Sequence, residues 1–182
     1  MEIVGLGSTG CKIAKYFEKY SQYNVHYINV DIKGKNCYSF SASETTEDAE
    51  QSTPKFLKLI NKIKNEIVFI CAGDENVSGS ILATIEQFKH LTVDVIYVRP
   101  DLDFLGETKR LQEKTICGIL QNYARSGLFR QMYLIDSTKV AKVLNNLSIT
   151  EYYEKINALI ANSFHMLNYL KNSSSVINNI SP

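Results

Sequence analysis

The sequence predicts an α/β fold: a three-layer, doubly wound parallel sheet of Rossmann-like type. Short apolar runs alternate with amphipathic helical stretches along the chain, which is typical of strand–helix–strand units in parallel sheets. Several runs are apolar at successive positions, as in strands that are buried on both faces. The first run continues through a glycine-rich turn into a helical stretch, "IVGLGSTGCKIA".

The expected strands and helices alternate along the first three quarters of the chain. Five strands are predicted, most of them rich in β-branched or aromatic residues, at 3–6, 25–30, 67–71, 93–98 and 131–135. Helices are expected between them at 9–20, 53–64, 80–90 and 107–124. The polar segment 33–52 is either a mobile surface loop or a flap over a ligand, and the sequence favours neither.

The C-terminal part is predicted to form one long core helix, about residues 149–171, that packs across the sheet. Ser148 and Glu151 form a capping box at its start. Its apolar face is expected to collect Tyr152, Ile156, Leu159, Ser163, Leu167 and Leu170, which recur at helical spacing. We expect residues 1–171 to form a single domain and residues 172–182 a flexible tail.

Composition excludes several classes of protein. The 182 residues are 45% hydrophobic and 21% charged, the balance of a soluble globular domain. The formal net charge of +1 predicts no general attraction to nucleic acid or membrane. No apolar run is long enough to span a bilayer, so we expect a cytoplasmic protein. The four cysteines are widely spaced, which favours reduced thiols over a metal site or disulfides. Frequent Asn, Lys and Ile residues are typical of AT-rich genomes, including viral ones.

The glycine turn has the spacing of a phosphate-binding loop. Gly7 and Gly10 let the backbone approach a pyrophosphate, and the following helix offers its N-terminal amides. Ser8 and Thr9 can add hydroxyl donors. The alternative is a tight turn whose glycines serve only helix–strand packing. Because both position and context fit, we favour phosphate binding.

Asp31 ends the second predicted strand, in "YINVD". A Rossmann fold places its ribose-binding acid about this far from the glycine turn. On these features alone, the chain is also compatible with an NAD(P)-binding domain.

The loops after the later strands carry a second resemblance. They read "FICAGDENVSGS" (69–80), "VRPDLDFLGETKR" (98–110) and "IDSTKV" (135–140). Their order resembles the nucleotide-binding domain of the tubulin/FtsZ family. That family has a glycine-rich phosphate signature, a K-P-F-x-F-E-G loop and a P-N-D loop that leads to a core helix. The resemblance covers almost the whole chain and implies GTP or GDP as the ligand, with or without Mg²⁺.

The resemblance implies a nucleotide site that is spread along the chain. Matched to the family's motifs, its residues are Gly7, Ser8, Thr9, Gly10, Lys12, Asp31, Gly73, Ser78, Gly79, Ser80, Lys109, Arg110, Ser137 and Asn157. Several have a plainer reading. Asn157 is equally well an exposed polar residue, Arg110 a helix-surface charge, and Ser78 and Ser80 helix caps.

The phosphate signature departs from the family pattern. Glu75, Asn76 and Val77 stand where the family has glycines, which permit close backbone approach. The Glu75 carboxylate would also repel phosphate oxygens. Leu105 replaces a ribose-contacting Glu, and Ser137 replaces a guanine-facing Asn.

The chain also lacks what the resemblance assigns to catalysis. The family hydrolyses GTP between subunits, through acidic residues that follow the core helix, and no Asp or Glu follows Leu170 here. We therefore assign no catalytic and no metal-ligating residue. We expect a binding and assembly module that is at most a weak GTPase and needs a partner subunit for that activity. Its expected partner is a second copy of the chain or a tubulin/FtsZ-like protein. The alternatives are an oxidoreductase's NAD(P)-binding domain and a structural relative without ligand.

Overall fold

A six-stranded, all-parallel sheet forms the centre of the computed structural model, which describes residues 1–144, 148 and 151–173. The strands are β1 (Glu2–Leu6), β2 (Asn24–Val30), β3 (Cys37–Phe40), β4 (Glu66–Ala72), β5 (Thr92–Arg99) and β6 (Gln131–Asp136). Their order is β3-β2-β1-β4-β5-β6. The strand order therefore reverses beside β1, so the loops that follow β1 and β4 flank the topological switch point, where such sheets bind ligands.

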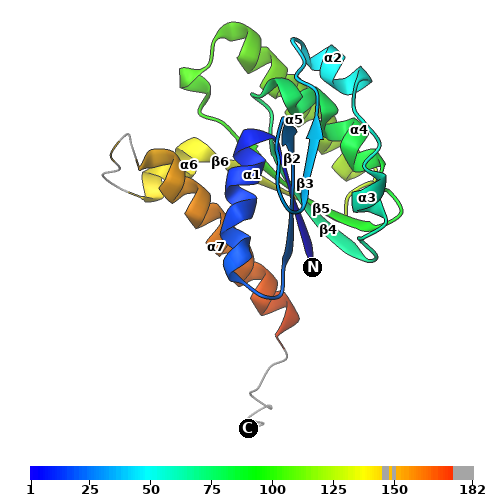
Figure 1. The fold of residues 1–182 in the computed structure, drawn as a ribbon. Coiled ribbons are helices and arrows are strands. Elements are labelled where there is room, and N and C mark those ends of the chain that lie inside the picture. The colour runs from blue at the N-terminus through cyan, green and yellow to red at the C-terminus, as the bar shows by residue number, and fades with distance from the viewer. Residues whose placement is uncertain (145–147, 149–150, 174–182) are drawn as a thin grey trace.

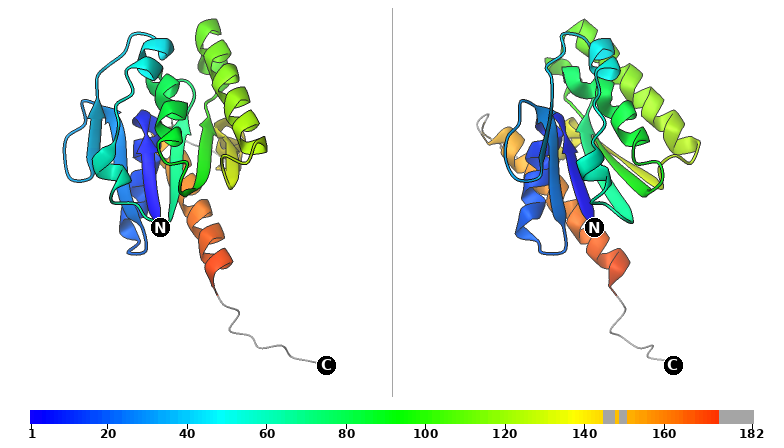
Figure 2. Two further views of the ribbon diagram at one scale, coloured as in Figure 1. Left: turned by 90° about the vertical axis from the view of Figure 1, so that its right-hand side faces the viewer. Right: turned by 45° about the vertical axis from the view of Figure 1, so that its right-hand side comes forward.

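Helices cover both faces of the sheet, which confirms the predicted fold class. One face carries α1 (Gly7–Lys15), α6 (Ser137–Val143) and α7 (Tyr152–Asn172). The other carries α2 (Thr46–Gln51), α3 (Leu57–Ile60), α4 (Ser80–Glu86) and α5 (Glu107–Arg125). Figures 1 and 2 show the two helix layers on opposite sides of the strands. Short 3₁₀ turns lie at Tyr16–Lys19, Asn76–Gly79 and Leu102–Phe104.

The central strands are apolar at successive positions because each face has its own core. In β4, Ile67 and Phe69 pack on the side of α4 and α5, whereas Val68 and Ile70 pack on the side of α1 and α7. All four side chains are buried. Burial on both faces thus explains the continuous apolar runs that predicted the parallel sheet.

The segment 33–52, expected to be irregular, contains β3 and α2. β3 pairs with β2 at the edge of the sheet, and of its four residues only Phe40 is fully buried. Two neighbouring expectations for helices were too long. The helix expected at 53–64 is a single turn, Leu57–Ile60, and the one expected at 80–90 ends at Glu86. Ile63 and Phe88 are buried in the core beyond these helix ends, so the apolar spacing continues where the helices have already stopped.

The long C-terminal helix is confirmed, but it begins at Tyr152 and buries a different face from the one predicted. Ser148 donates a hydrogen bond to Glu151 at 2.8 Å ahead of the helix, and residues 149 and 150 of the expected capping box lie outside the described residues. Leu167 and Leu170, expected in the core, are exposed. The buried residues are Ile156, Asn157, Ile160, Ala161 and Phe164.

The cause of this difference is the path of α7. Its first half lies on the sheet beside α1, and its last turns extend beyond the sheet (Figure 2). Phe164 meets the rings of Phe17 and Tyr133, with centroids 6.0 and 5.4 Å away. No helix among the described residues is both long and apolar enough to cross a membrane. Most of the expected tail, residues 174–182, lies outside the described residues.

Candidate ligand site at the carboxyl edge of the sheet

A cavity of about 370 Å³ opens at the carboxyl edge of the sheet. Five predicted site residues line it together: Ser8, Thr9, Lys12, Ser137 and Asn157. They come from α1, α6 and α7, which are far apart in the sequence. The cavity lies beyond the carboxyl ends of β1, β4, β5 and β6. Its position therefore agrees with the general rule for ligands in open parallel sheets.

The glycine turn itself is shaped by two different constraints. Gly7 has φ +76°, a left-handed conformation that L side chains rarely adopt. Gly10 instead lies directly against the backbone carbonyl of Ile70, so that a Cβ at residue 10 would collide with β4. Gly10 therefore serves helix–strand packing, whereas Gly7 brings the start of α1 close to the loop after β4.

The backbone amides at the start of α1 are bonded to a side chain from that loop. Glu75 accepts hydrogen bonds from the amide of Ser8 at 2.6 Å and from the amide of Thr9 at 2.7 Å, one to each carboxylate oxygen. These are the amides that the sequence assigns to phosphate. A carboxylate of the protein therefore lies at the helix N-terminus, where an anion is favoured by free N–H groups and by the helix dipole.

The loop that carries Glu75 is held by α5. The Nε2 of Gln112 lies 3.0 Å from the carbonyl oxygen of Gly73 and 2.8 Å from that of Glu75. It also lies 2.8 Å from the buried Ser78 hydroxyl. The carbonyl of Glu75 accepts a further bond from the Ser78 amide at 3.0 Å. The backbone of residue 75 is thus fixed on one side while its side chain reaches α1.

The other residues of the predicted phosphate signature support this loop and do not line the cavity. The buried Ser80 hydroxyl donates to the carbonyl of Val77 at 2.7 Å. Gly79 lies against the backbone of Thr46 at the start of α2. Gly73 lies against the hydroxyl of Tyr97, and neither glycine leaves room for a Cβ.

The remaining predicted residues lie outside the cavity. Asp31 is exposed at the end of β2. Lys109 donates to Gln112 at 3.3 Å and lines a different cavity beside α2. Arg110 donates through Nε to the carbonyl of Leu102 at 2.7 Å. Among the described residues that line the 370 Å³ cavity, Lys12 is the one with a positive charge.

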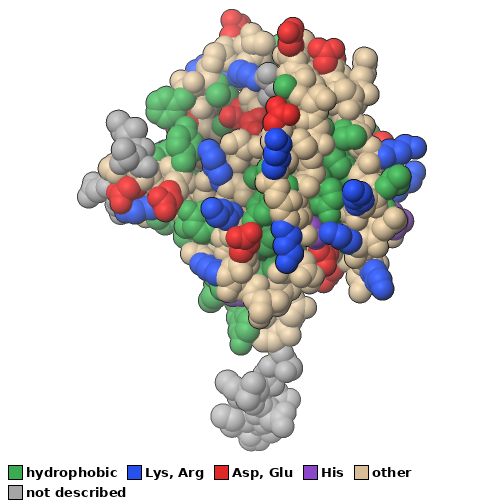
Figure 3. Space-filling view, in the orientation of Figure 1, with side chains coloured by type: hydrophobic (Ala, Val, Ile, Leu, Met, Phe, Trp, Pro, Cys, Tyr) green, Lys and Arg blue, Asp and Glu red, His purple; other side chains and the backbone are tan. Residues whose placement is uncertain are grey.

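Acidic and aromatic side chains complete the lining. Asp74 lies beside Glu75, and its Oδ1 is buried without a hydrogen-bond partner among the described residues. Burial raises the pKa of the Asp74 carboxyl above its ordinary value of 3.8. Phe104, Tyr152 and Tyr153 also line the cavity. Figure 3 shows a group of acidic side chains near the upper end of the visible face, above most of the basic ones.

Sequence reasoning anticipated some of these residues and missed others. Glu75 was recognised as a carboxylate in place of a glycine, which is the signal that led to it. Gln112 had no signal, because it is an ordinary polar residue in the pattern of a helix. Tyr152 was assigned to the core, whereas it is half-buried at the cavity.

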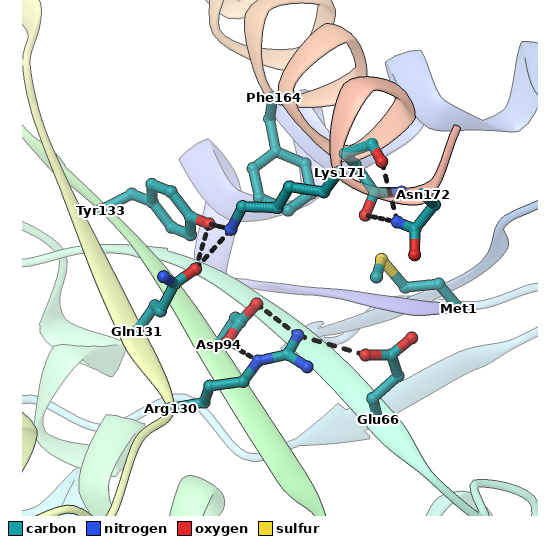
Figure 4. Close-up of a pocket in the computed structure, with 10 residues that line it drawn as sticks. Met1, Glu66, Asp94, Arg130, Gln131, Tyr133, Phe164, Lys171 and Asn172 are labelled. Carbon is teal, nitrogen blue, oxygen red and sulfur yellow. Dashed lines mark hydrogen bonds and ion pairs between the residues drawn. The ribbon is translucent and has the colours of Figure 1, made fainter. Parts of the chain in front are cut away.

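A second cavity, of about 260 Å³, lies at the opposite, amino edge and contains none of the predicted site residues. There Arg130 forms two hydrogen bonds with Asp94, at 2.8 and 2.9 Å, and one with Glu66 at 3.1 Å (Figure 4). Lys171 donates to Gln131 at 2.6 Å and to Tyr133 at 2.8 Å. The bonds to Asp94 and Glu66 raise the pKa of Arg130. The carboxylates of Asp94 and Glu66 neutralise the Arg130 guanidinium. The cluster therefore links the beginnings of β4, β5 and β6.

Across the part of the chain that the structure describes, no three His, Cys, Asp or Glu side chains gather as metal ligands would. The four cysteines are free thiols. Burial raises the pKa of both Cys11 and Cys71 to about 12. These two thiols are therefore un-ionised at neutral pH: Cys71 is buried in the core, and the Cys11 thiol donates to the carbonyls of Gly5 and Ile28 at 3.3 and 3.6 Å.

Comparison with known proteins gives structural neighbours only. No protein-family model matches the sequence, and no curated protein matches it significantly. An empty FtsZ dimer from M. jannaschii superimposes with a TM-score of 0.77 at 13% identity, over 97% of this chain and 56% of that one. A point mutant of M. jannaschii FtsZ gives 0.76 at 13% identity, over 97% and 58%. The chain thus spans just over half the length of these proteins, and over that span it has the fold of FtsZ.

Proposed function

We propose that this chain is an FtsZ-like binding and assembly module whose carboxyl-edge cavity takes a guanine nucleotide. One observation carries the proposal. Residues that were matched to the family's nucleotide site from separate parts of the sequence, Ser8, Lys12, Ser137 and Asn157 among them, line one cavity at the switch point of the sheet.

The lining suggests how a nucleotide would lie. Lys12 and the hydroxyls of Ser8 and Thr9 are the lining groups that suit phosphates. Asn157 is buried and also lines the cavity, and its amide offers both a donor and an acceptor, as the edge of guanine requires. Tyr152 and Tyr153 offer ring faces on which a base can stack.

The proposal is for binding and assembly without catalysis by the isolated chain. Hydrolysis of GTP requires a group that orients the attacking water and charges that stabilise the leaving phosphate. Glu75, the carboxylate nearest the amides of α1, is already bonded to two of them. One of the structural neighbours is a dimer by its description, which supports self-association as the mode of assembly.

Calorimetric titration with GDP, GTP, ATP and NAD⁺ tests the proposal. We expect binding of the guanine nucleotides in preference to ATP and NAD⁺. Lys12→Ala should weaken GDP binding about tenfold, as expected for the loss of one charge-assisted contact to phosphate. Lys15→Ala is the matched control, because Lys15 is exposed on the same helix but does not line the cavity.

Three outcomes would contradict the proposal. Preferential binding of NAD⁺ would support an oxidoreductase's dinucleotide domain. The absence of heat with every ligand would support a structural relative without ligand. Equal losses of GDP affinity in the Lys12→Ala and Lys15→Ala variants would place the nucleotide elsewhere on the chain.

A further inference from the structure

We propose that Glu75 is a built-in occupant of the phosphate position, and that it sets the ligand specificity of the cavity against phosphate groups. The identity of the nucleotide rests on the proposed function, but the role of Glu75 can be tested without it. The carboxylate competes with any anion for the first amides of α1. It is therefore an autoinhibitory group that belongs to the same chain as the site.

The geometry of Glu75 is that of a bound anion. Each of its carboxylate oxygens accepts one backbone N–H, from Ser8 at 2.6 Å and from Thr9 at 2.7 Å. A Cβ built on Gly7 would lie 2.5 Å from Oε2, so the carboxylate is packed against the turn itself. Hydrogen bonds between a charged acceptor and N–H groups at a helix N-terminus are among the strong ones.

The backbone of Glu75 is pre-organised for this contact. Gln112 and the Ser78 amide both bond to the carbonyl oxygen of Glu75, at 2.8 and 3.0 Å. Because the backbone is already fixed, only the rotamers of the side chain have to be ordered when it docks. A free anion must give up translational freedom to reach the same amides, so the internal carboxylate has the advantage.

A phosphate cannot simply share the position. Two negative groups at hydrogen-bond distance from the same amides repel each other strongly at a partly buried site. Asp74 and Asp101 add two further acidic side chains to the lining, and Lys12 is the cation among the described lining residues. The cavity as it stands thus favours the nucleoside part of a ligand over its phosphates.

Inorganic pyrophosphate is the probe that tests this role without a base. The full chain and its variants would be compared by thermal unfolding with and without pyrophosphate. Glu75→Ala should unfold at a lower temperature than the unsubstituted chain, and pyrophosphate should restore part of the loss by occupying the freed amides. Glu75→Gln should bind pyrophosphate at least about tenfold more tightly than the unsubstituted chain, which corresponds to about 1.4 kcal/mol.

Two controls separate occupancy from net charge. Asp74→Asn removes the same charge from the same cavity without affecting the hydrogen bonds to the amides of Ser8 and Thr9. Its gain in pyrophosphate affinity should therefore be clearly smaller than that of Glu75→Gln. Glu86→Gln removes a charge from the exposed C-terminal end of α4 and should behave like the unsubstituted chain. If Glu75→Ala does not fold, the isosteric Glu75→Gln provides the comparison.

The outcomes distinguish this inference from the proposed function. Unchanged pyrophosphate affinity in Glu75→Gln, or an equal gain in Asp74→Asn, would overturn the inference. A gain for pyrophosphate with no binding of GDP would support the role of Glu75 and contradict the guanine-nucleotide proposal. GDP affinities that are equal in the unsubstituted chain and in Glu75→Gln would support the proposal and overturn the inference.

Discussion

At the scale of single residues, the turn after β1 allows little variation at Gly7. Its φ of +76° and the position of Glu75 both exclude a side chain. Gly7→Ala should lower the free energy of unfolding by about 1–2 kcal/mol from backbone strain alone. Gly118 is the contrasting position, because it is exposed within α5 and an added methyl group would meet no neighbouring atom there. Gly118→Ala should raise stability by about 0.5–1 kcal/mol.

Urea unfolding of the two variants checks this prediction. Changes of opposite sign are expected, because only one of the two glycines is required by its conformation. A Gly7→Ala chain as stable as the unsubstituted one would contradict the left-handed conformation of residue 7.

Asp74 gives a prediction that depends on pH. Burial raises the pKa of its carboxyl above 3.8 in the folded chain. Above that raised pKa the folded state holds a charge that the unfolded state solvates better, so ionised Asp74 lowers stability at neutral pH. Asp74→Asn should therefore stabilise the chain at pH 7, and the gain should disappear as the pH falls below 3.8.

Denaturant unfolding at pH 7 and at acid pH, with Glu86→Gln alongside, measures this effect. Glu86 is exposed on α4, so its variant should show no comparable gain at pH 7. A stabilisation by Asp74→Asn that is equal at both pH values would contradict the assigned cause.

Individual site residues could be predicted where they belong to a local sequence pattern, and not where they act through contacts that only the folded chain makes. Ser8 and Lys12 follow a glycine turn with a defined spacing, and Glu75 replaces a glycine, so each was visible in the sequence. Gln112 acts through three contacts to a loop about forty positions earlier. Such a contact leaves no local pattern, because only the folded chain brings the two segments together.

At the scale of elements, the buried face of α7 differs from the apolar face that the sequence predicted. Phe164 is buried against Phe17 and Tyr133, whereas Leu167 is 48% exposed. Phe164→Ala should destabilise the chain by about 3 kcal/mol or more, as for other buried aromatic side chains. Leu167→Ala should cost less than about 1 kcal/mol.

Chemical denaturation of these two variants tests the orientation of the helix. Equal losses, or a larger loss for Leu167→Ala, would indicate that the face predicted from spacing alone is the buried one. Far-UV circular dichroism provides the control that both variants remain folded.

The central strands were predicted well because their burial is continuous, whereas of the two edge strands β6 was predicted and β3 was not. The strands β1, β2, β4 and β5 lie in the middle of the sheet, so their side chains are apolar on both faces and mark them clearly. β3 is a four-residue edge strand in a polar segment. The buried face of α7 was predicted wrongly because apolar residues occupy more than one side of this helix. Their spacing is compatible with two apolar faces, and tertiary packing buries only one of them.

At the scale of the whole molecule, we expect nucleotide binding without turnover. Purified chain incubated with GTP and Mg²⁺ should release phosphate at the background rate, because Glu75, the carboxylate at the start of α1, is bonded to the amides of Ser8 and Thr9 and is not available to orient a water molecule. Light scattering should not rise and then decay, as it would for filaments driven by hydrolysis. Saturable turnover that disappears in Glu75→Ala would show that the chain carries its own catalytic group.

Nuclear magnetic resonance of the ¹⁵N-labelled chain titrated with GDP locates the ligand directly. We expect the backbone amide signals of Ser8 and Thr9 and the side-chain amide signal of Asn157 to shift together, with one saturation curve. In Glu75→Gln the same signals should shift at lower GDP concentrations. Shifts confined to the amino-edge cavity, at Gln131 and Asn168, would place GDP at the opposite end of the sheet and contradict binding at the carboxyl edge.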